Sequence, residues 1–299
     1  MEMTYFRSIC LVVFCQFGTL IPFHLNALAE ERGNIVDEDR SDNQGSKKTM
    51  RLISELTRLG AEQFDRRDES AERKGLWFEL NDSGQVIAIC IPNSKCTDET
   101  LRVISYAENL AVLDLGNTSI SSAGMAHLRN LKHLGSVGLY GTNVDDDCCK
   151  VLSNFKKTIV LYLGNTRITD AGVKRLSNLR NLQHVMLNGN NVTDEALKSL
   201  RNCSTLALLD MSNTKITNTG IKYLSEKTPL IVNDGGVELR IGVVVQYINV
   251  KNTLVDSGCV DHLMALDLLG TLELSKGQIS VDGINRLKKK FDGIVISEE

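Results

Sequence analysis

The side chains that could carry out chemistry are scattered along the chain rather than grouped. Three consecutive acids, Asp145 to Asp147, are compatible with calcium binding, but no second oxygen-rich segment with a fixed loop pattern accompanies them. The four histidines after residue 29 form no set of nucleophile, base and orienting acid; they are His127, His133, His184 and His262. There is no H-E-x-x-H, G-x-S-x-G or phosphate-binding loop. The sequence therefore predicts a protein that is not an enzyme and binds no cofactor and no metal.

The cysteines do not have the spacing of a metal site either. Six of the eight follow residue 89, namely Cys90, Cys96, Cys148, Cys149, Cys203 and Cys259. Cys96 and Cys149 coincide with apolar positions of the repeat described below, so we expect them to act as small hydrophobic residues. A secreted chain could form disulfides, and the sequence leaves open whether any forms.

These residues are positioned by a unit that repeats every 24 residues, six times. Two of its rows are wholly apolar: Ile89, Leu113, Val137, Leu161, Val185 and Leu209, and Ile91, Leu115, Leu139, Leu163, Leu187 and Met211. In each repeat the two apolar residues lie two positions apart, a spacing that is typical of a strand. Val173, Leu176 and Leu179 share one face of a helix. One unit cannot bury its apolar face alone, so the sequence predicts a stacked solenoid.

The polar rows predict where each helix begins and where the chain turns. A row of Ser, Thr and Asp, from Thr97 to Thr217, can accept hydrogen bonds from free N–H groups at a helix start. The next row, from Asp98 to Asn218, is acidic in four of six repeats, which suits the positive end of a helix dipole. Asn or Gly occupies the turn row, where φ can be positive. The following row, mostly Thr, should point inward and satisfy backbone groups.

The units LDLGNTSISSAGMAHL, LYLGNTRITDAGVKRL and LDMSNTKITNTGIKYL resemble leucine-rich repeats. They resemble the secreted bacterial type with N-T-x-I-T-D-x-G that occurs in planctomycete proteins. They are also similar to the cysteine-containing repeats of F-box adaptor proteins, with Thr in place of Cys. The resemblance implies an α/β solenoid: a leucine-rich repeat horseshoe with a parallel concave sheet and short convex helices. It is specific for the fold, which hosts many unrelated binding roles.

The N-terminal segment predicts export. Residues 1–29 read as a signal peptide, because an apolar run follows Arg7 and Ala27-Leu28-Ala29 offers a cleavage site. The alternative of a membrane anchor is less favourable, since the run is short and interrupted. We therefore expect a secreted, periplasmic or cell-envelope protein with no stable membrane span after cleavage. The polar residues 30–49 predict a flexible linker.

The remaining boundaries follow from the repeat register. Residues 50–84 predict an N-terminal cap made of a helix and a hairpin, with the turn at Asn81 to Gly84. Trp77 is expected in this cap, and a ligand-stacking role for it is an alternative. Six regular repeats cover residues 85–230, and Leu230 keeps the row of Leu206. Residues 231–299 predict degenerate repeats with an insertion of about fifteen residues and a C-terminal cap.

The repeat also determines which side chains face outward on the concave sheet. The outward rows vary freely, whereas the core rows vary conservatively. The candidate partner-binding residues are Asp114, Tyr140, Tyr162, His184, Met186, Asn188 and Asp210. Tyr and Met are favoured at interfaces, and a net charge of −3 argues against a nucleic-acid partner. The sequence thus predicts a non-catalytic module that binds a protein or peptide on its concave face.

Two other functions stay open. The chain could be a substrate-recognition adaptor of a ubiquitin-ligase-like complex, although no F-box-like segment precedes the repeats and the N-terminal signal argues against it. It could also be an enzyme with a site in the insertion at 231–250, which only the departure from the repeat supports.

Overall fold

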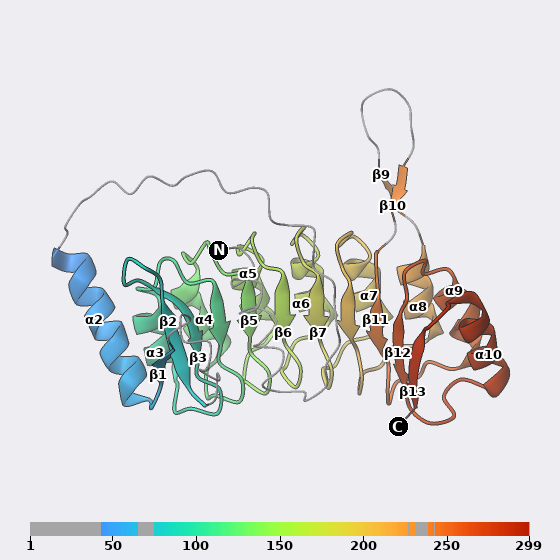
Figure 1. Cartoon of the computed structure of the whole chain (residues 1–299), viewed down its shortest axis with the longest axis horizontal. Coiled ribbons are helices and arrows are strands. Elements are labelled where there is room, and N and C mark those ends of the chain that lie inside the picture. The colour runs from blue at the N-terminus through green and yellow to red at the C-terminus, as the bar shows by residue number, and fades with distance from the viewer. Residues whose placement is uncertain (1–42, 65–74, 227, 231–238, 242, 299) are drawn as a thin grey trace.

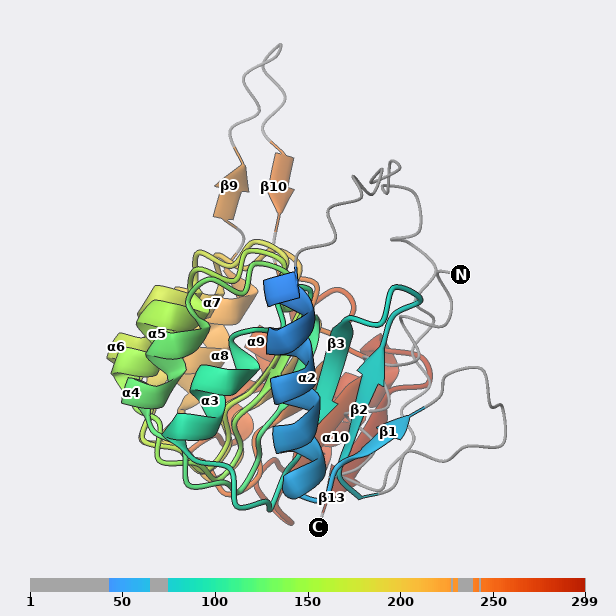
Figure 2. The same ribbon diagram turned by 90° about the vertical axis from the view of Figure 1, so that its left-hand side faces the viewer.

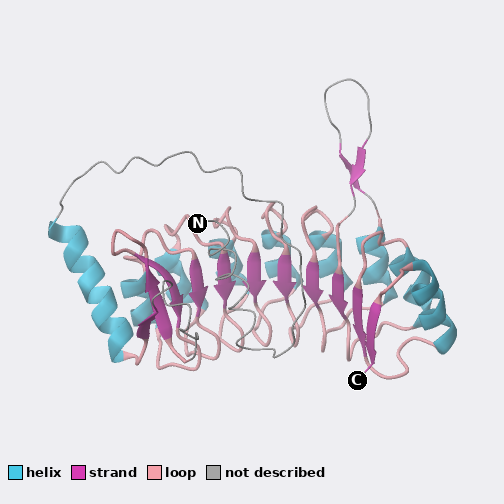
Figure 3. Ribbon diagram, in the orientation of Figure 1, coloured by secondary structure: helices cyan, strands magenta, loops and turns pink. Residues whose placement is uncertain are grey.

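The structure, a computed structural model, describes residues 43–64, 75–226, 228–230, 239–241 and 243–298. The predicted signal peptide and the linker up to residue 42 lie outside these ranges. Strands and helices alternate along an elongated molecule, with all strands of the main sheet in one layer and the repeat helices in the other (Figures 1 and 2). Figure 3 shows the loops that join the two layers at both edges of the sheet.

Eleven strands form the sheet in the order β1-β2-β3-β4-β5-β6-β7-β8-β11-β12-β13. The repeat strands are β3 (Val86–Cys90), β4 (Val112–Asp114), β5 (Ser136–Gly138), β6 (Val160–Tyr162), β7 (His184–Met186), β8 (Leu208–Asp210), β11 (Tyr247–Asn249), β12 (Thr271–Leu274) and β13 (Val295–Glu298). From β3 onward every pair is parallel. The predicted parallel sheet is therefore confirmed.

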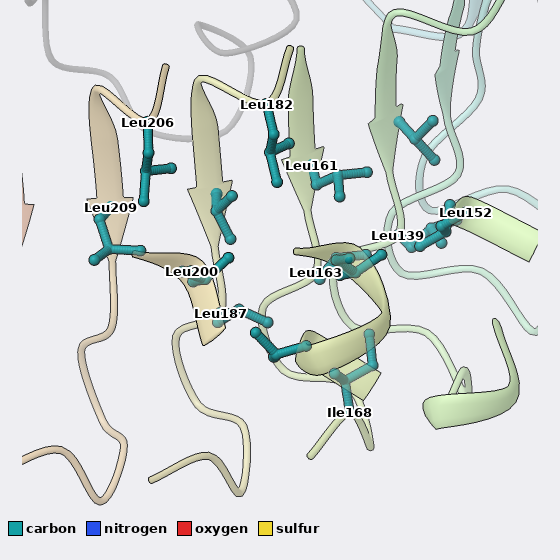
Figure 4. Close-up of a cluster of buried hydrophobic side chains, with 14 of the residues drawn as sticks. Leu139, Leu152, Leu161, Leu163, Ile168, Leu182, Leu187, Leu200, Leu206 and Leu209 are labelled. Carbon is teal, nitrogen blue, oxygen red and sulfur yellow. The ribbon is translucent and has the colours of Figure 1, made fainter. Parts of the chain in front are cut away.

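A short helix follows most of these strands on the opposite layer. The helices are α3 (Asp98–Ile104), α4 (Ser122–Met125) with the 3-10 turn η1 (Ala126–Leu128), α5 (Asp146–Leu152), α6 (Asp170–Leu176), α7 (Asp194–Leu200), α8 (Asn218–Ser225), η2 (Ser257–Cys259) with α9 (Val260–Met264), and α10 (Val281–Lys290). Between the layers lies one continuous apolar core. Leu161 and Leu163 are fully buried in it, beside their counterparts from neighbouring repeats (Figure 4). Cys96 and Cys149 are buried there too, as expected.

Hydrogen bonds at the helix starts join consecutive repeats. Thr169 caps α6 by accepting the N–H of Ala171, as the sequence predicts. The acidic row does more than complement the helix dipole. Asp170 accepts both the backbone N–H of Thr193 at 2.8 Å and its hydroxyl at 2.7 Å, so its carboxylate links α6 to the cap of α7. Asp98, Asp146 and Asp194 make the same pair of bonds to the next repeat.

This polar ladder needs close packing between repeats and ends where the repeats end. A Cβ added to Gly172 would come within 2.3 Å of an Asp146 oxygen, so the glycine makes room for the carboxylate. In the last helix, α10, Val281 occupies the acidic position and is exposed. No helical repeat follows α10 among the residues described, so no cap is there to receive a carboxylate.

The turns match the prediction from the Asn/Gly row. Asn93, Asn117, Asn165 and Asn213 have φ between 50° and 55°. The following Thr row points inward: Thr118 Oγ1 donates to the carbonyl of Leu115 at 2.6 Å. This bond satisfies a carbonyl at the corner where the strand ends, as expected.

A helix and a hairpin cover the N-terminal end of the core. The helix α2 (Asn43–Arg58) buries Leu52 and Leu56, and Gly60 ends it with φ of 89°. The strand β2 (Trp77–Leu80) pairs antiparallel with β3, and β1 (Glu62–Phe64) pairs parallel with β2. The helix begins earlier than predicted, inside the expected linker of residues 30–49. Phe64, within the predicted cap, lies in β1.

The insertion carries a separate two-stranded sheet that stands away from the solenoid (Figures 1 and 2). Its strands, β9 (Thr228–Leu230) and β10 (Leu239–Ile241), are antiparallel. Leu230 therefore does not keep the row of Leu206. Fifteen residues later, Val245 takes that place before β11 and is buried, because the insertion shifts the register. Residues 231–238 and 242, within the hypothetical enzyme site, lie outside the described ranges.

Candidate partner-binding face

The outward side chains of β3 to β8, continued by β11 and β12, form the surface we name the concave face. The parallel register places its central row in one line across the strands. That row is Cys90, Asp114, Gly138, Tyr162, Met186, Asp210, Asn249 and Glu273. Four of the predicted residues, Asp114, Tyr162, Met186 and Asp210, thus share one row. The sequence expectation that these side chains lie on one face agrees with this register.

An apolar cluster separate from the core occupies much of the concave face. It consists of Trp77, Ala88, Cys90, Val112, Val160, Tyr162, Met186, Leu208 and Tyr247. Phe64 packs against it, with its ring centroid 5.9 Å from that of Trp77. Trp77 therefore belongs both to the N-terminal cap and to this face. Of the predicted contact residues, Tyr140 and His184 are partly exposed, and the other five are buried.

Two buried carboxylates end strands of this face. One oxygen of Asp114 accepts the N–H of Gly116, and one of Asp210 accepts the N–H of Ser212, each at 2.9 Å. Burial raises the pKa of both carboxyl groups, and these backbone hydrogen bonds oppose the shift. The second oxygen of Asp114 lies 3.8 Å from the Cys90 sulfur. These acids therefore have a local role in the turn as well as a charge.

Tyr140 and Asn188 lean over the same glycine from opposite sides. A Cβ on Gly164 would come within 2.2 Å of Asn188 Oδ1 and 3.0 Å of Tyr140 Cδ2. The Tyr140 hydroxyl accepts a hydrogen bond from the Asn165 amide. Gly164 therefore lies between two larger residues of the neighbouring repeats, and its lack of a side chain leaves room for both Tyr140 and Asn188.

Among the described residues, three buried polar atoms of the concave face have no hydrogen-bond partner: Ser136 Oγ, His184 Nδ1 and Asn188 Oδ1. They come from β5 and from β7 with the turn that follows it. Burial lowers the pKa of His184 to about 4, so its imidazole is neutral at neutral pH. Buried polar groups are nearly always hydrogen-bonded. The sequence had indicated His184 and Asn188 but not Ser136.

A polar group on β11 and β12 extends the face beyond the predicted residues. The Tyr247 hydroxyl donates to Glu273 at 2.7 Å, and Lys251 forms an ion pair with Glu273 at 3.0 Å. Sequence analysis predicted the insertion of about fifteen residues but took its candidate residues from the six regular repeats before it. The signal that could have found them is the offset of 39 residues between Leu209 and Ile248, which pair directly.

In the described part of the chain, no three or more His, Cys, Asp or Glu residues are grouped so as to hold a metal ion. None of the helices in those ranges combines the length and apolar character that crossing a bilayer requires.

No protein-family model matches the chain, and no curated protein matches its sequence. Among solved structures, internalin C2 of Listeria monocytogenes is similar with a TM-score of 0.52 and 21% identity, over 72% of this chain and 81% of internalin. The chain has the leucine-rich-repeat fold. A plant peptide hormone receptor, RGFR1 in complex with RGF2, gives a TM-score of 0.47 and 18% identity over 77% of this chain. This leucine-rich-repeat chain spans only 38% of that receptor chain.

Proposed function

We propose that this leucine-rich-repeat chain is a non-catalytic interaction module that binds a protein or peptide on its concave face. The observation that carries the proposal is the set of partnerless polar atoms of Ser136, His184 and Asn188 beside an apolar cluster. A bound polypeptide supplies apolar side chains for the cluster together with backbone N–H and C=O groups for these atoms. Comparable orphan atoms do not occur on the helical face of the described chain.

The rigidity of the solenoid supports the same role. The carboxylate ladder and the continuous core hold neighbouring strands in fixed register, so a partner meets a surface that is already ordered. A preformed surface loses less conformational entropy on binding. The fold therefore suits recognition along several strands at once.

Photo-cross-linking tests the proposal. A benzophenone-bearing residue placed at Tyr140, on the concave face, should cross-link to a protein or peptide in the producing cells or their medium. The same residue placed at Lys174, which is exposed on α6, should not. Introducing Met186→Glu should abolish the cross-link from position 140 while the circular dichroism spectrum stays the same. Equal cross-linking from both positions, or insensitivity to Met186→Glu, contradicts the proposal.

We also propose that the chain acts outside the cytoplasm, after export directed by residues 1–29. The features that support this are the apolar run after Arg7 and the cleavage sequence ending at Ala29. Expression in a secreting host followed by N-terminal sequencing should give a mature chain that begins at Glu30. Retention in the cytoplasm with an intact N-terminus contradicts it.

A further inference from the structure

The central row of the concave face carries two carboxylates that no cation balances in the described chain. Asp114, in β4, and Asp210, in β8, are both buried. Neither forms an ion pair among the residues described, whereas Glu273 in the same row pairs with Lys251. A buried charge without a partner is costly. The two acids therefore need an explanation beyond packing.

Their role in the turn does not explain their charge. Asn249 occupies the same row in β11 and accepts the N–H of Lys251 at 3.1 Å, which is the bond that Asp114 and Asp210 make to their own turns. A neutral amide is thus sufficient for this cap. What aspartate adds at positions 114 and 210 is a negative charge directed toward the concave face.

The surface between the two acids is apolar and has a defined length. Gly138, Tyr162 and Met186 separate them in register, on β5, β6 and β7. Four strand spacings amount to about 19 Å, which is the span of about six residues of an extended chain. In an extended chain, residues six apart point to the same side. One segment crossing the strands can therefore reach both acids.

We infer that the partner contacts the concave face through an extended segment with two basic side chains about six residues apart and apolar side chains between them. The basic groups pair with Asp114 and Asp210, and the apolar ones pack on Tyr162 and Met186. This inference rests on the proposed function and names the class of partner. Charge-assisted hydrogen bonds from Arg or Lys are among the strongest available to a buried carboxylate.

The acceptor oxygens in the same region favour a partner that carries many N–H groups. Asn188 is 8% exposed, and its Oδ1 accepts nothing. Asp114 and Asp210 can only accept while ionised. Asp114 also accepts from the Cys90 thiol, and Asp210 from the side chains of Ser212 and Asn249, but no cation is among these donors. A basic partner adds the missing positive charge, whereas an acidic partner would add repulsion.

A selection with defined variants tests the inference. The probe is a displayed library of random linear peptides about twelve residues long, twice the inferred span. It is selected on the full chain and rescreened on Asp114→Asn, Asp210→Asn and the double variant. The control double variant, Asp147→Asn with Asp282→Asn, removes the same charge from exposed positions on the helical layer.

The asparagine variants retain the turn caps and should remain folded. Because burial raises the pKa of both acids, neutralising them does not lower thermal stability near neutral pH. We expect enriched peptides to carry two basic residues at the inferred spacing. Their Kd should weaken about tenfold with each single variant and stay unchanged with the control.

Two outcomes overturn the inference and separate it from the proposed function. Enriched peptides that lack paired basic residues, or that bind the double asparagine variant equally, refute the basic partner. If their binding is nevertheless lost with Met186→Glu, the concave face stands as the binding surface. Failure to enrich any peptide, or binding indifferent to Met186→Glu, overturns both.

Discussion

The inner and concave faces of the repeat strands are both largely buried, but they differ in whether their buried polar atoms have hydrogen-bond partners. On the inner face, Leu161 and its counterparts are aliphatic, and Thr158, which takes the place of a leucine in its row, donates its hydroxyl to the carbonyl of Leu134 at 3.1 Å. On the concave face, carboxylates lie beside aromatic and thioether groups, and Ser136 Oγ has no partner. The inner-face hydroxyl is thus satisfied within the chain and Ser136 Oγ is not, a difference that the proposed function explains by a bound partner.

The largest expected loss of stability is for a substitution on the inner face. Leu163→Ala should lower the free energy of unfolding by about 2–5 kcal/mol, because it leaves a cavity in a core that cannot collapse to fill it. Met186→Ala on the concave face should cost less, about 1 kcal/mol, because Met186 is still 8% exposed and its truncation leaves a hollow open to solvent rather than a closed cavity. Urea unfolding followed by circular dichroism gives both values. Equal losses would remove the distinction between the faces.

The next effect concerns the ladder that holds the repeats in register. Asp170→Ala removes two hydrogen bonds to Thr193 and leaves a backbone N–H unsatisfied, so we expect a loss of about 1–3 kcal/mol. Asp282→Ala, at an exposed position of α10, should change stability by less than about 0.5 kcal/mol. The same urea titration applies. A loss at Asp170 no larger than that at Asp282 would mean that the ladder contributes nothing.

A third effect depends on pH and concerns His184 on the concave face. The folded state keeps His184 neutral down to its lowered pKa of about 4, whereas the unfolded chain binds a proton near its ordinary pKa of about 6.5. The unfolded state therefore binds more protons between these values, and stability from this group falls as pH drops through that window. His184→Gln should remove this part of the pH dependence in urea titrations repeated across the window. An unchanged slope contradicts the burial of a neutral imidazole.

Most of the fold could be predicted because one spacing determines many positions at once. A period of 24 residues places Leu163 inside and Tyr162 outside in the same step, and the caps and turns follow from residue type. The bridging role of Asp170 could not be predicted in this way. A helix dipole explains an acid at that position equally well, and only the neighbouring repeat reveals the second interaction.

The candidate site was less predictable, because it depends on what each side chain meets. The sequence indicated that Asp114 and Asp210 face outward, but not that each caps its own turn. Tyr247 and Glu273 were not indicated because the candidate residues came only from the six regular repeats, which precede the insertion before β11. A repeat pattern identifies a face, whereas burial and hydrogen bonding on that face depend on contacts between repeats.

The most direct test of the contrast compares two buried hydroxyls, one on each face. Ser136→Ala and Thr158→Val each remove a hydroxyl with little change in shape. Because Ser136 Oγ has no partner and Thr158 Oγ1 has one, Ser136→Ala should leave the free energy of unfolding unchanged or raise it by about 1 kcal/mol, and Thr158→Val should lower it by about 1 kcal/mol. Equal destabilisation by both would show that the concave face is already satisfied within the chain, which contradicts its assignment as a surface awaiting a partner.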